Sequence, residues 1–290
     1  MRIRATVAAV SGALALSALA VPAAQASDDS SYRAQAARVL AHAGSPGADR
    51  TAFNAAAAPE LGVSFSNFKV AKAVKVGTTA PVSVTATYTL THGADVDITS
   101  EDFATGPFLY RGSSFDSAEN VLFGAYPATC TATSATTANC KGAIEIEPGD
   151  LWNANAGTWS GGGLALDYST EGEKVQGGLG KILVQRLSKL TADATPEPVK
   201  KGKTITVTGK LSRANWETNK YAGYSTQPVK LQFRKANSST YTTVKTIKTN
   251  STGNLSTTVT ASVDGYFRYS FAGTSTTPAV NAAGDYVDVR

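Results

Sequence analysis

Two cysteines, two histidines and a few closely spaced carboxylates are the residues of this 290-residue chain whose types could do chemistry. Cys130 and Cys140 are ten positions apart. An even cysteine number in an exported chain is typical of a disulfide, which here would join a hairpin or a short surface loop. The alternative is a metal pair, but His42 and His92 would complete a poor ligand set. The spacing therefore predicts a structural Cys130–Cys140 disulfide and no metal site.

The sequence lacks the usual catalytic motifs. It has no Gly-x-Ser-x-Gly nucleophile elbow, no His-Glu-x-x-His motif and no phosphate loop. His92 in a Thr-His-Gly turn and His42 in an alanine-rich stretch are a poor supply of general bases for a triad. Oxidised cysteines could not act as nucleophiles. We therefore predict that the protein is not an enzyme and uses no cofactor.

Carboxylate pairs leave two alternatives open. Glu145 and Glu147 would share one strand face, as would Asp95 and Asp97, and a glycosidase needs two facing carboxylates. The same spacing is common on the solvated face of a sheet, which is the interpretation we favour. A run of acidic residues could also supply oxygen ligands to Ca²⁺, although it forms no Asp-x-Asp-x-Asp-Gly loop: Asp95, Asp97, Glu101 and Asp102. Hydrolase and calcium-binding functions are the less favoured hypotheses.

Aromatic residues in one long predicted connection favour a binding function. Trp216, Tyr221 and Tyr224 fall between residues 211 and 227, with Lys220 among them. Rings on loops can stack on sugar faces or peptide partners, and the lysine would favour an anionic polymer. The alternative is that Trp216 packs at the end of the core and the connection is scaffold. These four residues are the candidate ligand-binding residues.

The N-terminus has the layout of a secretory signal peptide, residues 1–26. Arg2 and Arg4 precede an apolar run, and Ala24-Gln25-Ala26 offers small residues for cleavage before Ser27. The alternative is a short N-terminal membrane anchor, and no later stretch approaches the ~18 consecutive apolar residues of a membrane span. We expect a secreted protein, extracellular or cell-wall-associated, without a membrane span.

Charge is distributed unevenly along the chain. Residues 27–187 carry 11 basic and 16 acidic residues, whereas residues 188–290 carry 14 basic and 6 acidic residues. The basic half could mark an anionic partner such as an acidic wall polymer or a membrane surface. We favour the simpler interpretation, a lysine-rich strand surface that discourages edge-to-edge pairing. With 42% hydrophobic and 17% charged residues, the composition excludes a disordered charged tail.

Hydrophobic periodicity predicts an all-β protein of two sandwich domains after an alanine-rich segment. Residues 27–59 predict a flexible lead containing a marginal helix near 32–40. Residues 60–187 contain about seven short strands, the best of them at 81–90, and this spacing predicts a β-sandwich. After a Pro-containing boundary, the strand pattern restarts in residues 188–290, which have the size of an immunoglobulin-like sandwich.

Several stretches of residues 60–290 resemble secreted actinobacterial proteins of unknown function. Four stretches resemble the C-terminal module of that family: Thr195–Gly202, Gly209–Leu211, Val229–Arg234 and Gly265–Arg268. The part with Cys130 and Cys140 is similar to a domain of unknown function that often precedes the module. The resemblance implies export and β-sandwich domains. Such proteins are sometimes labelled calcium-binding, but no ligand residue carries over.

The sequence thus predicts a non-enzymatic secreted module, binding or structural, at the cell surface or in the medium. The principal alternative is a carbohydrate- or cell-wall-binding protein that uses the aromatic loop of the C-terminal domain. Expected partners are cell-wall polysaccharide or another surface protein, and we expect no nucleic-acid partner. The sequence leaves the oligomeric state open.

Overall fold

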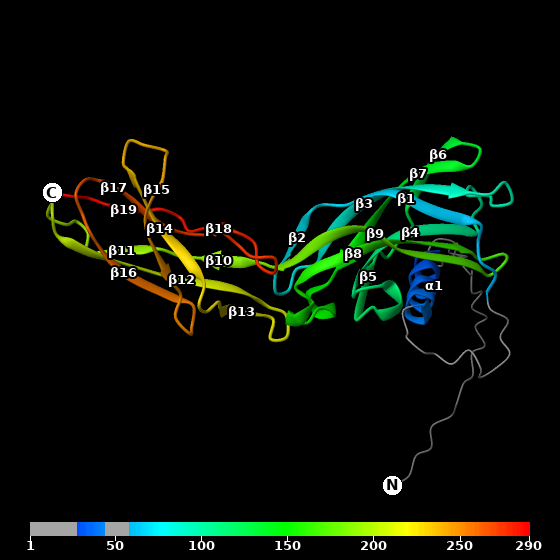
Figure 1. Cartoon of the computed structure of the whole chain (residues 1–290), viewed down its shortest axis with the longest axis horizontal. Helices are drawn as coiled ribbons and strands as arrows, with labels where there is room; N and C mark the ends of the chain where they lie inside the picture. The colour runs from blue at the N-terminus through cyan, green and yellow to red at the C-terminus, as the bar shows by residue number, and fades with distance from the viewer. Residues whose placement is uncertain (1–27, 44–57) are drawn as a thin grey trace, which may run out of the picture.

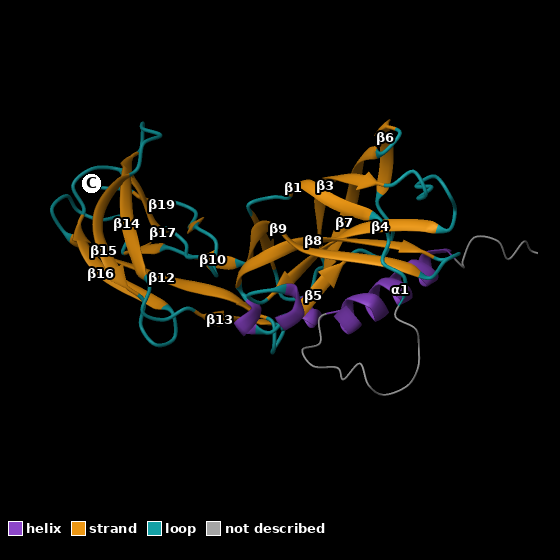
Figure 2. Ribbon diagram, turned by 45° about the vertical axis from the view of Figure 1, so that its right-hand side comes forward, coloured by secondary structure: helices purple, strands orange, loops and turns teal. Residues whose placement is uncertain are grey.

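The computed structural model describes residues 28–43 and 58–290, which form two β-sandwich domains arranged end to end along the long axis of the molecule (Figure 1). Figure 2 shows how strands dominate both domains. The expected signal peptide lies outside the described residues. Among the residues described, no helix is long and apolar enough to cross a membrane. The all-β fold class predicted from the sequence is confirmed.

The first domain pairs a four-stranded sheet with a five-stranded sheet. The four-stranded sheet has the order β1 (Val63–Lys69), β3 (Val82–His92), β7 (Thr137–Ile146) and β6 (Thr129–Ser134). The five-stranded sheet has the order β2 (Ala73–Val76), β9 (Gly172–Arg186), β8 (Gly157–Asp167), β4 (Phe103–Arg111) and β5 (Asn120–Phe123). Short 3₁₀ helices occur in its connections: Phe115–Ser117, Pro148–Asp150 and Asn153–Asn155.

The alternation predicted for residues 81–90 is confirmed in β3. Val84, Ala86, Tyr88 and Leu90 point inward and are buried, while the residues between them face outward. Because successive side chains of a strand point to opposite faces, this alternation also sets the composition of the outer face of the sheet. That outer face carries Ser83 and then threonines at every second position from Thr85 to Thr91.

The helix α1 (Asp28–Ala43) covers the outer face of the five-stranded sheet (Figure 2). Its buried side chains recur at the spacing of one helical face and pack on β4 and β8: Tyr32, Ala36, Val39 and Leu40. The structure differs here from the expected marginal helix in a flexible segment. The apolar stripe is thin, but the sheet beneath it supplies large partners, such as Phe108 and Leu164.

The second domain has the strand arrangement of an immunoglobulin-like sandwich. One sheet consists of β10 (Ser188–Leu190), β11 (Asp193–Thr195), β12 (Thr204–Asn215), β13 (Lys220–Gly223) and β16 (Asn254–Thr260). The other consists of β15 (Thr242–Lys248), β14 (Pro228–Lys235), β17 (Gly265–Phe271), β18 (Val280–Asn281) and β19 (Asp285–Val287). Apolar alternation breaks at Val244, which predicts a bulge or an early strand end there. The β14–β15 register skips this residue.

Two side chains, the buried Tyr269 and Lys245 at the sheet edge, form hydrogen bonds between the two sheets of the second domain. The Tyr269 hydroxyl donates to the carbonyl oxygen of Val207 at 2.7 Å, and burial raises the pKa of Tyr269 to about 12. At the open edge of the sandwich, Lys245 of β15 reaches across to β16. Its Nζ donates to Thr257 Oγ1 at 3.1 Å and to the Thr258 carbonyl oxygen at 2.8 Å.

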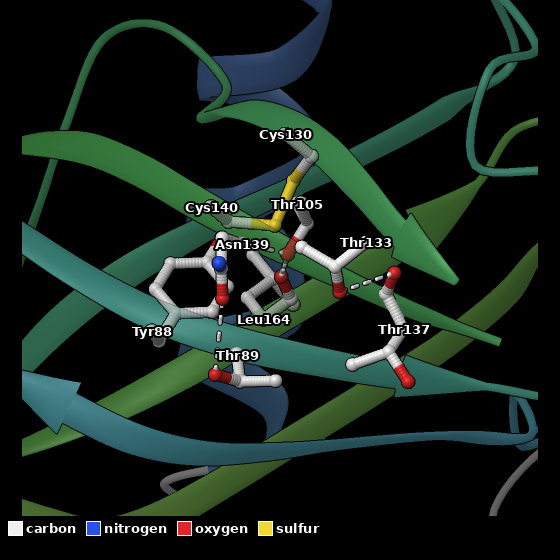
Figure 3. The surroundings of a disulfide bond; sticks show 9 residues. All are labelled: Tyr88, Thr89, Thr105, Cys130, Thr133, Thr137, Asn139, Cys140 and Leu164. Carbon is white, nitrogen blue, oxygen red and sulfur yellow. Dashed lines mark hydrogen bonds between the residues drawn. A yellow bond between two sulfur atoms is a disulfide. The ribbon is translucent and has the colours of Figure 1, made fainter.

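The predicted disulfide joins directly opposed residues of β6 and β7 (Figure 3). Cys140 is buried, and its Cα lies 4.0 Å from that of Cys130. Nearby, the Tyr88 hydroxyl lies 3.0 Å from Thr105 Oγ1, which donates to the Leu164 carbonyl oxygen at 2.7 Å. Polar contacts therefore connect the two sheets beside the disulfide.

Loss of the disulfide is expected to lower the free energy of unfolding by about 2–3 kcal/mol, because the bond closes a short loop in the unfolded chain. The measurement is denaturant unfolding of the Cys130→Ala/Cys140→Ala variant against the oxidised parent. The parent treated with reductant should approach the stability of this variant. Equal unfolding midpoints for oxidised and reduced parent would contradict the expectation.

Candidate functional site

Trp216 lies in the junction between the two domains. It is 2% exposed and belongs to the main core cluster of the first domain. Its indole Nε1 donates to the carbonyl oxygens of Gly77 at 3.0 Å and Val76 at 3.4 Å. The turn between β12 and β13 therefore inserts a side chain into the neighbouring domain. This corrects the hypothesis that Trp216 presents its ring to a ligand and supports the packing alternative.

Polar contacts surround this tryptophan and fix the junction. Asn153 of the first domain donates through Nδ2 to Asn215 Oδ1 at 2.9 Å and to Glu217 Oε2 at 2.7 Å. The guanidinium of the buried Arg186 donates through Nε to the Ala214 carbonyl oxygen at 2.6 Å. Burial, together with the charge of Arg213, lowers the pKa of Arg186 to about 10. The domains thus meet through a specific interface.

Of the remaining residues of the predicted aromatic loop, the two tyrosines are only partly exposed. The Lys189 ammonium lies 3.8 Å from the ring centroid of Tyr221, and burial raises the pKa of that tyrosine. The guanidinium of Arg213 lies 3.8 Å from the ring centroid of Tyr224. Lys220 is exposed. Cations therefore cover one face of each tyrosine ring, and ligand binding by this loop stays a prediction.

The carboxylate pairs lie on the solvent side of the first domain. Asp95, Asp97 and Glu147 are exposed, and Glu145 pairs with Arg33 of α1 at 3.2 Å. Asp97 Oδ1 accepts hydrogen bonds from the Thr99 hydroxyl and backbone, which lower its pKa. Within residues 28–43 and 58–290, no group of three or more His, Cys, Asp or Glu could hold a metal ion.

The outer face of the four-stranded sheet brings hydroxyl, amide and ammonium groups together. Lys69, Thr87 and Lys141 are direct neighbours across β1, β3 and β7. Two positions further along β3, Asn67 Nδ2 donates to Thr89 Oγ1, and Thr89 Oγ1 donates to Asn139 Oδ1, both at 3.3 Å. Figure 3 shows the Thr89–Asn139 bond. The alternation that buries the core residues of β3 turns these polar groups outward.

Two open hollows of about 340 and 430 Å³ lie on this face. Both are lined by Lys141, so they meet at this residue. Tyr126, which is 57% exposed, lines the first hollow from the connection between β5 and β6. Asn67 and Lys69 line the second. We call these hollows and their lining residues the groove.

The groove offers reversible binding through hydrogen bonds, charge and one aromatic ring. Threonine hydroxyls and asparagine amides can both donate and accept, which suits a ligand with many hydroxyl groups. Among the ion pairs of the described residues, none involves Lys69 or Lys141. The two ammonium groups are therefore available to a negatively charged or hydroxyl-rich ligand.

Sequence reasoning missed the groove because each signal was ambiguous. From the sequence alone, the threonines between Val84 and Leu90 predict only the ordinary polar face of a half-buried strand. The apolar pattern of residues 121–126 predicts a strand that ends at Tyr126, whereas β5 ends at Phe123 and leaves this tyrosine on a connection. The alternating threonines opposite two lysines of neighbouring strands are visible only once the register is known.

No protein-family model matches the chain, and no curated protein matches it. Among solved structures, a marsupial T cell receptor is 12% identical, with 78% of this chain and 73% of that chain covered and a TM-score of 0.34. Dimeric latent PorU from Porphyromonas gingivalis is 11% identical, with 78% and 20% covered and a TM-score of 0.27. The D00-D0 domain of intimin is 15% identical, with 78% and 98% covered and a TM-score of 0.25.

These likenesses are too distant to carry an argument about function. The class of the protein therefore rests on its own strand order. It is a two-domain β-sandwich protein whose C-terminal domain is immunoglobulin-like. The resemblance to secreted actinobacterial proteins stays a prediction.

Proposed function

We propose that the protein is a non-enzymatic, secreted polysaccharide-binding module, and that the groove of the first domain is its binding site. The observation that carries the proposal is the meeting of the two hollows at Lys141, with the exposed ring of Tyr126 at one end. The predicted secretory signal and the Cys130–Cys140 disulfide support a place outside the cytoplasm.

Shape supports a polymer segment as the ligand. The hollow volumes, about 340 and 430 Å³, fall within the range of small-ligand sites, roughly 300–1,000 Å³. Both hollows are open to solvent and follow the surface of one sheet. A chain of sugar rings could therefore lie across the sheet without having its ends enclosed.

Chemistry supports the same ligand class. A tyrosine ring presents an apolar face on which the C–H face of a sugar ring can pack. The hydroxyl and amide groups along Thr87, Thr89 and Asn139 can exchange hydrogen bonds with sugar hydroxyls. Lys69 and Lys141 add a preference for sugars that carry a carboxylate.

Replacing Tyr126 with alanine is expected to weaken oligosaccharide binding by about 1–3 kcal/mol, or roughly 5- to 150-fold, because its exposed aromatic ring lines the groove and can stack on a sugar ring. The melting temperature should change little, since the side chain is mostly exposed. Isothermal titration calorimetry with neutral and uronate-containing oligosaccharides measures the affinity.

The matched control is Trp152→Ala, which removes a ring that is 59% exposed and does not line the groove. This control should bind as the parent does. Equal losses in both variants would refute the groove as the site. Loss of binding in Lys220→Ala with Tyr126→Ala unaffected would place the site on the loop of the C-terminal domain.

A further inference from the structure

The outer face of the β14–β17 sheet carries arginines and tyrosines in stacked contact. We call this set the Tyr–Arg face: Arg234, Tyr241, Tyr266, Arg268 and Tyr286. Alternation along β14 and β17 buries Leu231, Phe267 and Tyr269 on the core side. The same alternation turns the arginines and Tyr266 outward.

The stacks follow the register of the sheet. Arg234 lies opposite Tyr266 on β17, and Tyr266 lies opposite Tyr286 on β19. The guanidinium carbon of Arg234 is 3.7 Å from the Tyr266 ring centroid, and the Tyr266 and Tyr286 centroids are 5.1 Å apart. The guanidinium carbon of Arg268 is 3.7 Å from the ring centroid of Tyr241.

The two guanidinium groups lie near each other and are held in place. Both are within 6 Å of the Tyr241 ring centroid, at 5.5 Å for Arg234 and 3.7 Å for Arg268. Arg268 Nε donates to Gln232 Oε1 at 2.9 Å, and Arg234 Nη1 donates to the Ser238 carbonyl oxygen at 2.8 Å. Stacking and hydrogen bonds thus reduce the side-chain entropy that a ligand would otherwise have to remove.

The positive charge of this face is not neutralised by ion pairs. Residues 228–248, which form β14, β15 and their hairpin, contain five basic residues and no acidic residue. The ion pairs of the described residues do not include Arg234 or Arg268. Burial and then the charges of Asp264 and Asp288 raise the pKa of Tyr286, so carboxylates border the face beside β19.

Planar guanidinium groups of fixed orientation are suited to carboxylates. Arginine binds a carboxylate through two parallel N–H···O bonds, whereas lysine acts as a point charge. Two such groups flanking one ring could take two carboxylates that recur along a polymer. The groove of the first domain binds hydroxyl groups and charge, so the same polymer could satisfy both surfaces.

The arrangement of the domains supports a shared ligand. Figure 1 shows the four-stranded sheet of the first domain and the β14–β17 sheet of the second domain on the same, upper side of the molecule. The junction around Trp216 holds the two domains against each other. Two sites at a fixed separation on one side convert the second contact with a long chain into an intramolecular step.

We propose that the Tyr–Arg face is a second binding site, for a carboxylate-bearing polysaccharide, and that it acts with the groove on one polymer chain. This inference rests on the proposed function of the groove. The face gives the charge selectivity, and the groove gives the contacts to sugar hydroxyls.

The test uses polygalacturonate as the probe and the double variant Arg234→Gln/Arg268→Gln. We expect at least a tenfold weaker affinity for the polymer and a shallower dependence of affinity on NaCl concentration. Affinity of the groove for a short neutral oligosaccharide should be unchanged. Because Arg234 also binds the hairpin backbone, the single variants Arg268→Gln and Arg268→Lys are measured as well. Arg268→Lys keeps the charge but should still weaken binding.

The matched control is Lys201→Gln/Lys210→Gln, which removes two exposed charges of the same domain outside the face and outside the candidate aromatic loop. An equal loss in this control would overturn the proposal, since the binding would then follow net charge. Binding of poly-glutamate as tight as that of polygalacturonate would overturn it in favour of an acidic polypeptide. The parent protein could bind no neutral oligosaccharide and still bind the polymer in a way that depends on the two arginines. That result would refute the groove as a binding site and would support the Tyr–Arg face as one.

Discussion

Replacing Trp216 with alanine is expected to lower the free energy of unfolding by about 3–5 kcal/mol, which is typical for removal of a large buried ring. The side chain is 2% exposed, and it packs in the core of the domain that does not contain it. Its loss would leave a cavity at the junction and would leave the carbonyl oxygens of Val76 and Gly77 without the indole donor. Denaturant unfolding measures the stability.

The same change should also uncouple the domains. Small-angle X-ray scattering should then show a broader distribution of interdomain distances than for the parent. Tyr221→Ala is the control, because it removes a neighbouring ring of the same loop that is only partly buried. A Trp216→Ala variant with unchanged stability and scattering would show that the junction does not depend on this residue.

Replacing Tyr32 with alanine is expected to lower the free energy of unfolding by about 3 kcal/mol or more and to release α1 from the sheet. Tyr32 is 2% exposed, and its ring stands over Gly106 of β4, where an added Cβ would collide with the tyrosine hydroxyl. Hydrogen exchange of the α1 amides, together with the melting temperature, measures the release. Gly106→Ala should act in the same direction, since it displaces the same ring.

The control for this prediction is Arg38→Ala, which changes an exposed residue of the same helix. Alanine has a helix propensity at least as good as that of arginine, so the free energy of unfolding should change by less than about 0.5 kcal/mol. If Tyr32→Ala left the exchange of α1 unchanged, the helix would be held by its other contacts.

Local sequence patterns predicted much of the fold, because apolar and polar residues alternate wherever one face of a strand is buried. The alternating residues of β3, the disulfide pair and the irregularity at Val244 all follow from two-residue periodicity and spacing. The packing of α1 did not follow, because the helix itself contributes few large side chains. Its stability comes from Phe108 and Leu164, which lie far away in the sequence.

The candidate sites could be predicted less well because they depend on which strands become neighbours. Nothing in the sequence places Lys69 beside Thr87 and Lys141, or Arg234 beside Tyr266 and Tyr286. For Trp216 the sequence raised both alternatives, an exposed ring and a core anchor. Only the position of the first domain decides between them.

Lys245, which bridges β15 and β16 at the edge of the second domain, bears on aggregation at high protein concentration. An exposed edge strand offers unpaired backbone groups to any other strand and is a route to aggregation. Lys245 binds the Thr258 carbonyl oxygen and places a charge over the gap between β15 and β16. A strand from another molecule would have to displace this bond and desolvate the ammonium group before pairing there. The single side chain thus helps to keep the sandwich from pairing edge to edge with the sandwich of another molecule.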